Sequence, residues 1–163
     1  MKIAVLFLGN PIFKDDAIGI EVGKRLVDRL EKLGMDVFIL ERTGLSLLDY
    51  ILGYERVVIV DSFKSNQHPI GDVYELPADS LTPQKTFSPH YAGLPEALMA
   101  IYALKPAQSS SIHIIAVEAN DPYTISEEMS VEISNKLETI VNCVFNLIIK
   151  IVDGGVFNNC SQA

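Results

Sequence analysis

Four short runs of apolar residues recur along the chain, and they predict the strands of a β-sheet. They span residues 3–8, 37–40, 57–60 and 112–117. All are rich in β-branched residues, and polar and apolar positions do not alternate within them. Such runs are typical of strands that are covered on both faces in a parallel sheet.

Between the first two runs, the apolar residues follow the spacing of an amphipathic helix. Over residues 16–33 they recur every three or four positions, from Ile18 to Leu33, with charged residues between them. Gly34 then suits the C-terminal end of this helix. Similar patterns predict helices over residues 45–52, 92–104 and 127–152, and residues 71–76 predict an additional strand at the sheet edge.

Strands and helices therefore alternate along the chain. This order predicts an α/β fold, with one open, mostly parallel twisted sheet and helices on both of its faces. No repeat or Pro/Gly/Ser-rich linker divides the sequence, so we expect residues 1–153 to form a single domain. Residues 154–163 begin with two glycines and are largely polar, and we expect them to form a flexible tail.

The composition narrows the possible partners. The 163 residues are 48% hydrophobic and carry 21 acidic and 13 basic side chains, a net charge of -8. A chain without a basic excess is a poor binder of nucleic acid or of anionic membrane surfaces. The most apolar stretch, residues 140–152, is shorter than the ~20 residues that span a bilayer, and the first residues lack a secretory pattern. We therefore expect a cytoplasmic protein, with Cys143 and Cys160 as buried or free thiols.

Candidate chemistry lies after the predicted strands, because ligands of open α/β sheets bind outside the carboxyl ends of the strands. Asp15 and Asp16 follow the first strand, Asp61 follows the apolar run of the third, and His90 precedes a predicted helix. Asp16, Asp61 and His90 would form an open set of three ligands for zinc or nickel. Each residue alone also has a structural interpretation. The carboxylates suit helix or turn caps, and a single histidine is commonly just hydrogen-bonded.

Other catalytic chemistries have weaker support. The first loop lacks both glycine-rich phosphate-binding patterns, and no GxSxG nucleophile elbow occurs. Ser62 and Ser88 lie near candidate residues but do not by themselves form a serine triad. His68 lies in a polar turn and His113 in a strand, and we interpret both as structural or solvated.

Three motifs occur in a characteristic order. They are Gly9-Asn10 followed by Asp15-Asp16-Ala17-Ile18-Gly19, Asp61 at the third strand, and Ser88-Pro89-His90 with Gly93-Leu94 behind it. With these motifs the chain resembles the hydrogenase maturation endopeptidases, which trim the C-terminus of the large subunit of nickel-iron hydrogenases. The resemblance covers residues 1–152.

The resemblance implies an enzyme, a metal-dependent endopeptidase in which Asp16, Asp61 and His90 bind the metal and carry the catalysis. In this family the metal is nickel already inserted in the substrate, the large-subunit precursor, which is cut once after a basic residue. Zinc or cadmium could occupy the same site in vitro. Hydrolysis of a peptide at a bound metal needs no separate nucleophile, which agrees with the open ligand set.

The resemblance also implies substrate-binding roles for Gly9, Asn10, Thr43 and Gly44. The Gly9-Asn10 loop has two interpretations, as a source of donors to the developing oxyanion or as a tight turn. Thr43-Gly44 resembles part of a Gly-Gly-Thr element near the end of the second strand. In this chain Glu41 and Arg42 replace the two glycines.

Two other functions remain open at this point. A non-catalytic binding module of the same fold would escort a metalloprotein during maturation without cutting it. A self-sufficient peptidase would hold its own zinc.

Within the first motif, only one of the two aspartates is expected to face the crevice, since consecutive helical residues point about 100° apart. The family pattern assigns the ligand to Asp16. Asp15 is then expected to cap the helix, and its replacement by Asn to cost at most about 1 kcal/mol.

Overall fold

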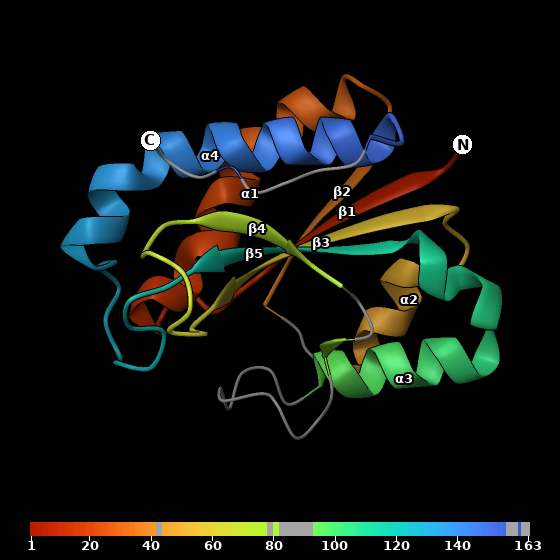
Figure 1. Ribbon diagram of the computed structural model, residues 1–163, viewed down its shortest axis with the longest axis horizontal. Coiled ribbons are helices and arrows are strands. Elements are labelled where there is room, and N and C mark those ends of the chain that lie inside the picture. The colour runs from red at the N-terminus through yellow and green to blue at the C-terminus, as the bar shows by residue number, and fades with distance from the viewer. Residues whose placement is uncertain (42–43, 78–79, 82–92, 156–159, 161–163) are drawn as a thin grey trace.

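Within the described part of the chain, five strands form one sheet in the order β2-β1-β3-β5-β4 in the computed structural model (Figure 1). The structure describes residues 1–41, 44–77, 80–81, 93–155 and 160. The strands are β1 (Ile3–Leu8), β2 (Asp36–Leu40), β3 (Arg56–Phe63), β4 (Val73–Leu76) and β5 (Ile112–Glu118). All pairs are parallel except β4 with β5 at the edge. The prediction of an open, mostly parallel sheet with an extra edge strand is confirmed.

Helices cover both faces of this sheet (Figure 1). On one face lie α1 (Ile18–Glu31) and α4 (Val131–Val152), and on the other α2 (Leu48–Ile51) and α3 (Leu94–Leu104). Short 3-10 helices occupy Lys14–Ala17 (η1), Gly44–Leu47 (η2) and Pro106–Ser111 (η4). No helix among the described residues is long and apolar enough to cross a membrane.

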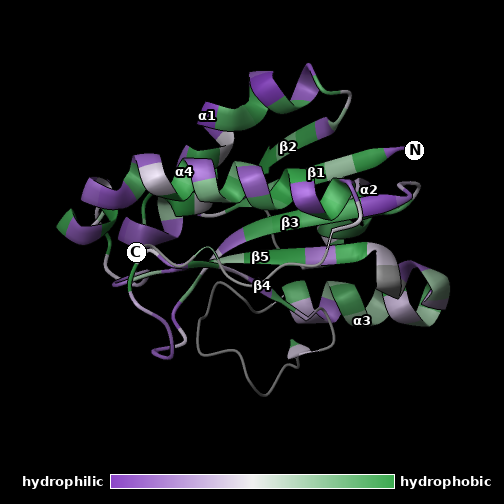
Figure 2. Ribbon diagram, turned by 45° about the horizontal axis from the view of Figure 1, so that its top comes forward, coloured by the Kyte–Doolittle hydropathy of each residue, from purple (hydrophilic) through white to green (hydrophobic). Residues whose placement is uncertain are grey.

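Each face of the sheet has its own hydrophobic core. Val5 and Phe7 of β1 pack with α1 and α4, whereas Ala4 and Leu6 pack with α2 and α3. Successive residues of a strand point to opposite faces, so a strand covered on both faces is apolar throughout. The central strands are accordingly hydrophobic over most of their length, while α1 and α4 alternate between polar and apolar residues (Figure 2).

The element bounds differ from the prediction in two places that matter for the site. β3 continues to Phe63, so Asp61 and Ser62 lie inside a strand, where they pair with Ala116 and Val117 of β5. The strand was predicted from its apolar residues. Because residues 61 and 62 are polar, the predicted strand ended too early. The predicted start of the last helix at residue 127 is also wrong. α4 begins at Val131, because hydrogen bonds hold the residues before it in a loop.

The prediction of free thiols is wrong. Cys143 of α4 and Cys160 form a disulfide, with their Cα atoms 6.0 Å apart. Cys160 also makes an antiparallel β-bridge with Val73 of β4. Residue 160 is therefore attached to α4 and β4, whereas the sequence predicted a flexible tail from residue 154 onward. The spacing of two cysteines along a chain does not reveal that a later segment returns to a helix.

Candidate active site

Asp16 follows β1, and Asp61 lies near the carboxyl end of β3. At these two neighbouring strands the order of strands in the sheet reverses its direction. After β1 the chain crosses through η1 and α1 to β2 on one side, and β3 lies on the other side of β1. The crevice outside such a switch point is where open α/β sheets bind ligands. η1 supplies Asp16 to this crevice, and β3 supplies Asp61.

Two glycines of the first motif let the chain pack tightly against the end of β1. A Cβ atom at Gly19 would lie 1.9 Å from the carbonyl oxygen of Leu8, and one at Gly9 would lie 2.4 Å from the carbonyl oxygen of Asp16. Both distances are far shorter than a non-bonded contact, so only glycine fits. The backbone N–H of Asn10 also donates to the carbonyl oxygen of Asp16 at 3.3 Å. These close approaches fix where η1 places Asp16.

The two carboxyl groups are almost completely buried. Asp16 is 3% exposed and Asp61 is 6% exposed. Burial raises the pKa of the Asp61 carboxyl well above its ordinary value, the negative charge of Asp16 raises it further, and the Ser62 N–H opposes both effects. Two neighbouring buried carboxylates repel each other, and a bound cation would relieve both the repulsion and the desolvation.

Ser62 connects the two carboxylates. Its backbone N–H donates to Asp61 Oδ1 at 2.8 Å, and its hydroxyl donates to Asp16 Oδ1 at 2.9 Å. The possible role of Ser62 as a nucleophile does not predict this link. The signal in the sequence is the position of Ser62 directly after Asp61.

The expectation that Asp15 caps its own helix is wrong. No side chain caps η1 or α1. The Asp15 carboxylate is fully buried and accepts the backbone N–H groups of Asn120, Asp121 and Ser130, together with the Ser130 hydroxyl. Asp15 therefore fixes the loop between β5 and α4. The two neighbouring aspartates do point to different partners, as the helical geometry predicted.

The geometry favours the turn interpretation of the Gly9-Asn10 loop. The Gly9 N–H donates to the carbonyl oxygen of Leu40, and the Asn10 N–H to that of Asp16. The side-chain oxygen of Asn10 accepts the N–H of Ile12 at 3.2 Å, which closes a local turn. Neither backbone N–H is therefore available for an oxyanion. The side-chain amide nitrogen of Asn10 is the donor of this loop that could still serve that purpose.

Two predicted site residues, Thr43 and His90, lie outside the described residues. So do Ser88 and Pro89 of the third motif, and Arg42. Among the residues that are described, no group of three His, Cys, Asp or Glu side chains could hold a metal ion. The described site therefore consists of the acidic pair, and the third ligand stays a prediction.

Gly44 is described, and it lies close to the chain that follows the third motif. It adopts a left-handed conformation with φ of 73°, at the start of η2. A Cβ at Gly44 would lie 3.9 Å from the Cα of Gly93, which precedes α3 by one residue. Gly93 follows His90 by three positions in the sequence. The start of η2 and the residue before α3 thus approach each other.

The other two histidines have structural partners, as predicted. His113 Nδ1 lies 2.7 Å from the Glu75 carboxylate across the β4–β5 pair. The His68 ring stacks on Tyr74, with ring centroids 3.8 Å apart. Neither contact brings a histidine to the acidic pair.

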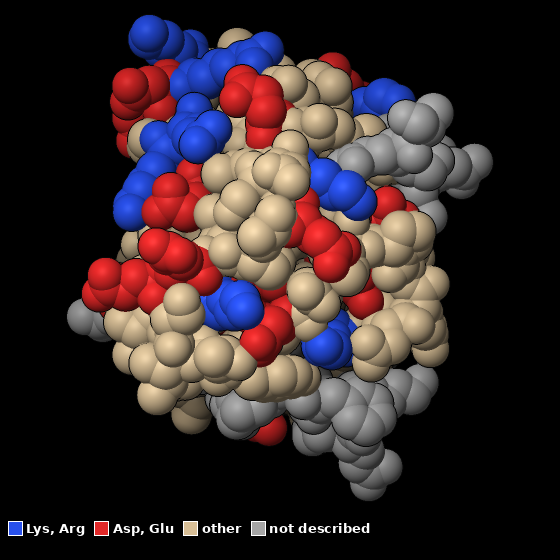
Figure 3. All heavy atoms as spheres, turned by 90° about the vertical axis from the view of Figure 1, so that its left-hand side faces the viewer, with Lys and Arg blue, Asp and Glu red and all other residues tan. Residues whose placement is uncertain are grey.

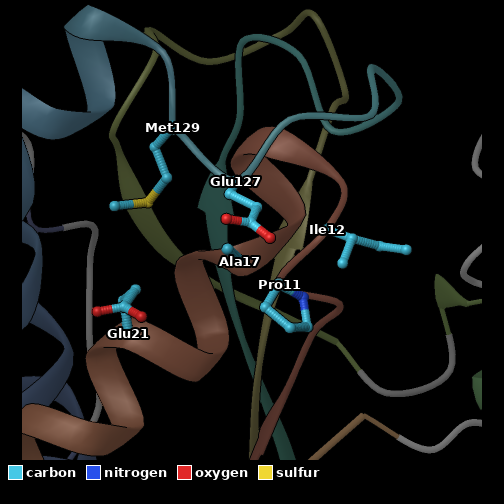
Figure 4. Close-up of a pocket in the computed structure, with 6 residues that line it drawn as sticks. All are labelled: Pro11, Ile12, Ala17, Glu21, Glu127 and Met129. Atoms are coloured by element: carbon cyan, nitrogen blue, oxygen red, sulfur yellow. The ribbon is translucent and has the colours of Figure 1, made fainter.

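A surface cavity lies beside η1 but does not contain the acidic pair. Figure 4 shows its lining, which comes from the segments after β1, the first turns before and within α1, and the loop before α4. The residues are Pro11, Ile12, Ala17, Glu21, Glu127 and Met129. The left-hand side of Figure 1, at the carboxyl ends of the parallel strands, carries acidic and basic side chains around an uncharged central area (Figure 3). The charge of Asp16 and Asp61 contributes little to this surface because both are buried.

A comparison with protein families places the chain beside a known family. A family model described as hydrogenase maturation protease matches residues 20–154. Asp61 and His90 fall within the matched residues, whereas Asp16 precedes them. Comparison with curated protein sequences gives no match.

Solved structures of hydrogenase maturation proteases share this architecture over nearly the whole chain. The [NiFe] hydrogenase maturation protease HybD from Thermococcus kodakarensis is 26% identical, with a TM-score of 0.67, and the match covers 90% of this chain and 99% of that one. The hydrogenase maturating endopeptidase HybD from E. coli is 20% identical, with a TM-score of 0.71 and coverage of 92% and 93%. HycI from Thermococcus kodakarensis KOD1 is 23% identical, with a TM-score of 0.68 and coverage of 93% and 92%.

Proposed function

The chain belongs to the hydrogenase maturation protease family, and we propose that it removes the C-terminal extension of a nickel-loaded hydrogenase large-subunit precursor. The cut is made at a metal held by Asp16, Asp61 and His90. The nickel arrives with the precursor, so the ion is part of the substrate. Cleavage then reports that the large subunit has received its metal.

The observation that carries this proposal is the buried acidic pair at the β1–β3 switch point. Asp16 and Asp61 come from separate segments, and both are almost completely buried. Each accepts a hydrogen bond from Ser62 that orients it. Placing two carboxylates together in a buried crevice is costly unless a cation joins them.

Each of the site residues has its own role in the proposed reaction. Asp16 and Asp61 supply oxygen ligands, and His90 supplies a nitrogen ligand. A metal held in this way would polarise the scissile carbonyl and lower the pKa of a bound water. As a ligand, Asp61 would bind the metal in its deprotonated form. The side-chain amide of Asn10, on the loop that precedes Asp16, donates to the developing oxyanion, and Thr43 and Gly44 contact the substrate.

The test uses two forms of one substrate. Purified protein is incubated with nickel-loaded and with nickel-free precursor, and the mass of each large subunit is followed. We expect loss of the C-terminal extension from the nickel-loaded form alone. Cleavage of both forms equally would contradict the dependence on nickel. Stable binding of the precursor without cleavage would instead identify a non-catalytic maturation module.

A second measurement separates a self-sufficient peptidase from the proposed enzyme. The metal content of the protein as purified is determined, and short peptides are offered as substrates. We expect substoichiometric metal and no turnover of the peptides. One tightly bound zinc per chain together with peptide hydrolysis would overturn the proposal that the metal comes with the precursor.

A further inference from the structure

Ser62 is placed to control the geometry of both candidate ligand carboxylates at once. It is fully buried in β3. Its hydroxyl donates to Asp16 Oδ1 and its backbone N–H donates to Asp61 Oδ1, at 2.9 and 2.8 Å. The two carboxylates belong to residues 16 and 61, which are 45 positions apart in the sequence. Ser62 forms a hydrogen bond with each of them.

The strand geometry explains how one residue can hold both. Along β3, Val58 and Val60 pack on the side of α1 and α4, and Val57 and Ile59 pack on the side of α2 and α3. Because side chains alternate, the Ser62 hydroxyl belongs to the same side as Val58 and Val60, where η1 precedes α1. The hydroxyl therefore reaches Asp16 on that side. The backbone N–H is left for the carboxylate of the preceding residue.

The end of the β1–β3 pairing leaves room for these contacts. The register of β1 with β3 ends at Phe7 opposite Val60, while β3 continues to Phe63 beside β5. Asp61 and Ser62 thus lie just beyond the last residue of β3 that β1 pairs with.

The chemistry of Ser62 fits orientation of a ligand rather than attack on a substrate. Its oxygen is buried and donates to a carboxylate, so it is not presented to a peptide. Hydrogen bonds to ionised carboxylates are stronger than those between neutral groups, and they restrict the rotation of the side chain. Partners of this kind, one step removed from a metal, orient its ligands and commonly change metal affinity 10–100-fold, roughly, when removed.

We infer that Ser62 is a positioning residue that holds Asp16 and Asp61 in the arrangement that binds the metal of the precursor. The inference rests on the proposed function. The hydroxyl fixes Asp16, and the main-chain N–H fixes Asp61. Only the first of these contacts can be removed by substitution of the side chain.

The first test measures metal binding without catalysis. Wild type, Ser62→Ala and Ser62→Thr are titrated calorimetrically with Cd²⁺ alone. We expect affinity to fall by about 10-fold or more in Ser62→Ala, and to be restored in large part in Ser62→Thr, which keeps the hydroxyl. Ser65→Ala is the matched control, because Ser65 also donates to a buried carboxylate, that of Glu118, outside the acidic pair. Its affinity for Cd²⁺ should equal that of wild type.

The second test uses the nickel-loaded precursor and separates positioning from loss of structure. Poor ligand geometry weakens engagement of the metal, so KM should rise in Ser62→Ala more than kcat falls. A variant that is merely less folded would lose active enzyme, and kcat would fall at an unchanged KM. Ser62→Ala with the affinity and KM of wild type would overturn the inference and leave the proposed function intact. A wild-type chain that neither binds Cd²⁺ nor cuts the precursor would overturn both.

Discussion

The Asp15 carboxylate accepts both the backbone N–H and the hydroxyl of Ser130, a residue 115 positions further along the chain, at 2.7 and 2.9 Å. Ser130 is the residue that precedes the first turn of α4. The same carboxylate accepts the N–H groups of Asn120 and Asp121. Asp15 thus joins η1, which carries Asp16, to the end of β5 and the start of α4.

This contact predicts that Asp15→Asn is much more destabilising than the loss of a helix cap. The Asn amide has one acceptor oxygen where the carboxylate has two, and its NH₂ group would face donors in a fully buried site. We expect a loss of about 2–4 kcal/mol in the free energy of unfolding, since an unsatisfied buried group alone costs about 1–3 kcal/mol. Urea unfolding measures it. Asp28→Asn, at an exposed position of α1, should change stability by less than about 0.5 kcal/mol. A loss below 1 kcal/mol for Asp15→Asn would restore the simple capping role.

Asp16→Asn should remove function and preserve the fold. The amide oxygen still accepts the Ser62 hydroxyl, so the local structure has little reason to change. A neutral amide is a poor metal ligand. Removal of a residue that only orients a metal ligand typically costs roughly 10–100-fold, and we expect cleavage of the nickel-loaded precursor to fall by more than this. Mass spectrometry of the precursor measures the cleavage, and circular dichroism checks the fold. Asp49→Asn, on the exposed side of α2, is the control and should cleave like wild type. A folded Asp16→Asn that cleaves normally would show that Asp16 is not a ligand.

Asp61→Asn should make the metal-free protein more stable at neutral pH. Burial and the charge of Asp16 raise the pKa of Asp61 in the folded state. The native state then binds more protons than the unfolded state above pH ~3.9, so stability falls as the pH rises through this range. Asn keeps the oxygen that accepts the Ser62 N–H and carries no charge. We expect a gain of roughly 0.5–2 kcal/mol at pH 7.

The pH dependence of this gain is the decisive measurement. Unfolding of wild type and Asp61→Asn is compared from pH 4 to pH 8 without metal. The difference between them should shrink toward pH 4, because Asp61 is then increasingly protonated in the unfolded state as well. A difference that is constant over this range would mean that the ionisation of Asp61 does not contribute.

The disulfide predicts a stability that depends on redox conditions. Reduction, or Cys160→Ser, opens a connection between residues 17 apart in sequence. We expect a loss of about 3 kcal/mol, the value that chain entropy gives for a loop of about 15 residues. The measurement is thermal or urea unfolding with and without a thiol reductant. The reductant should destabilise wild type and leave Cys160→Ser unchanged. An oxidised wild type in which both thiols react after unfolding would show that the bond does not form.

The sequence by itself determined the order of the elements and the edge of the sheet where the acidic residues gather. Apolar runs and helical spacing are local properties, and they report directly which faces of a segment are buried. Strand-end positions of Asp16 and Asp61 followed from the same pattern, because parallel strands end at one edge.

Only the tertiary structure decided which groups these residues meet. Asp15 binds Ser130, Cys143 bonds to Cys160, and Ser62 links the two aspartates, and none of these partners is set by local spacing. A hydrogen bond or disulfide between distant segments depends on how helices and strands pack. The sequence around a carboxylate at the start of a helix does not reveal whether the carboxylate caps that helix, binds a distant loop or serves as a metal ligand.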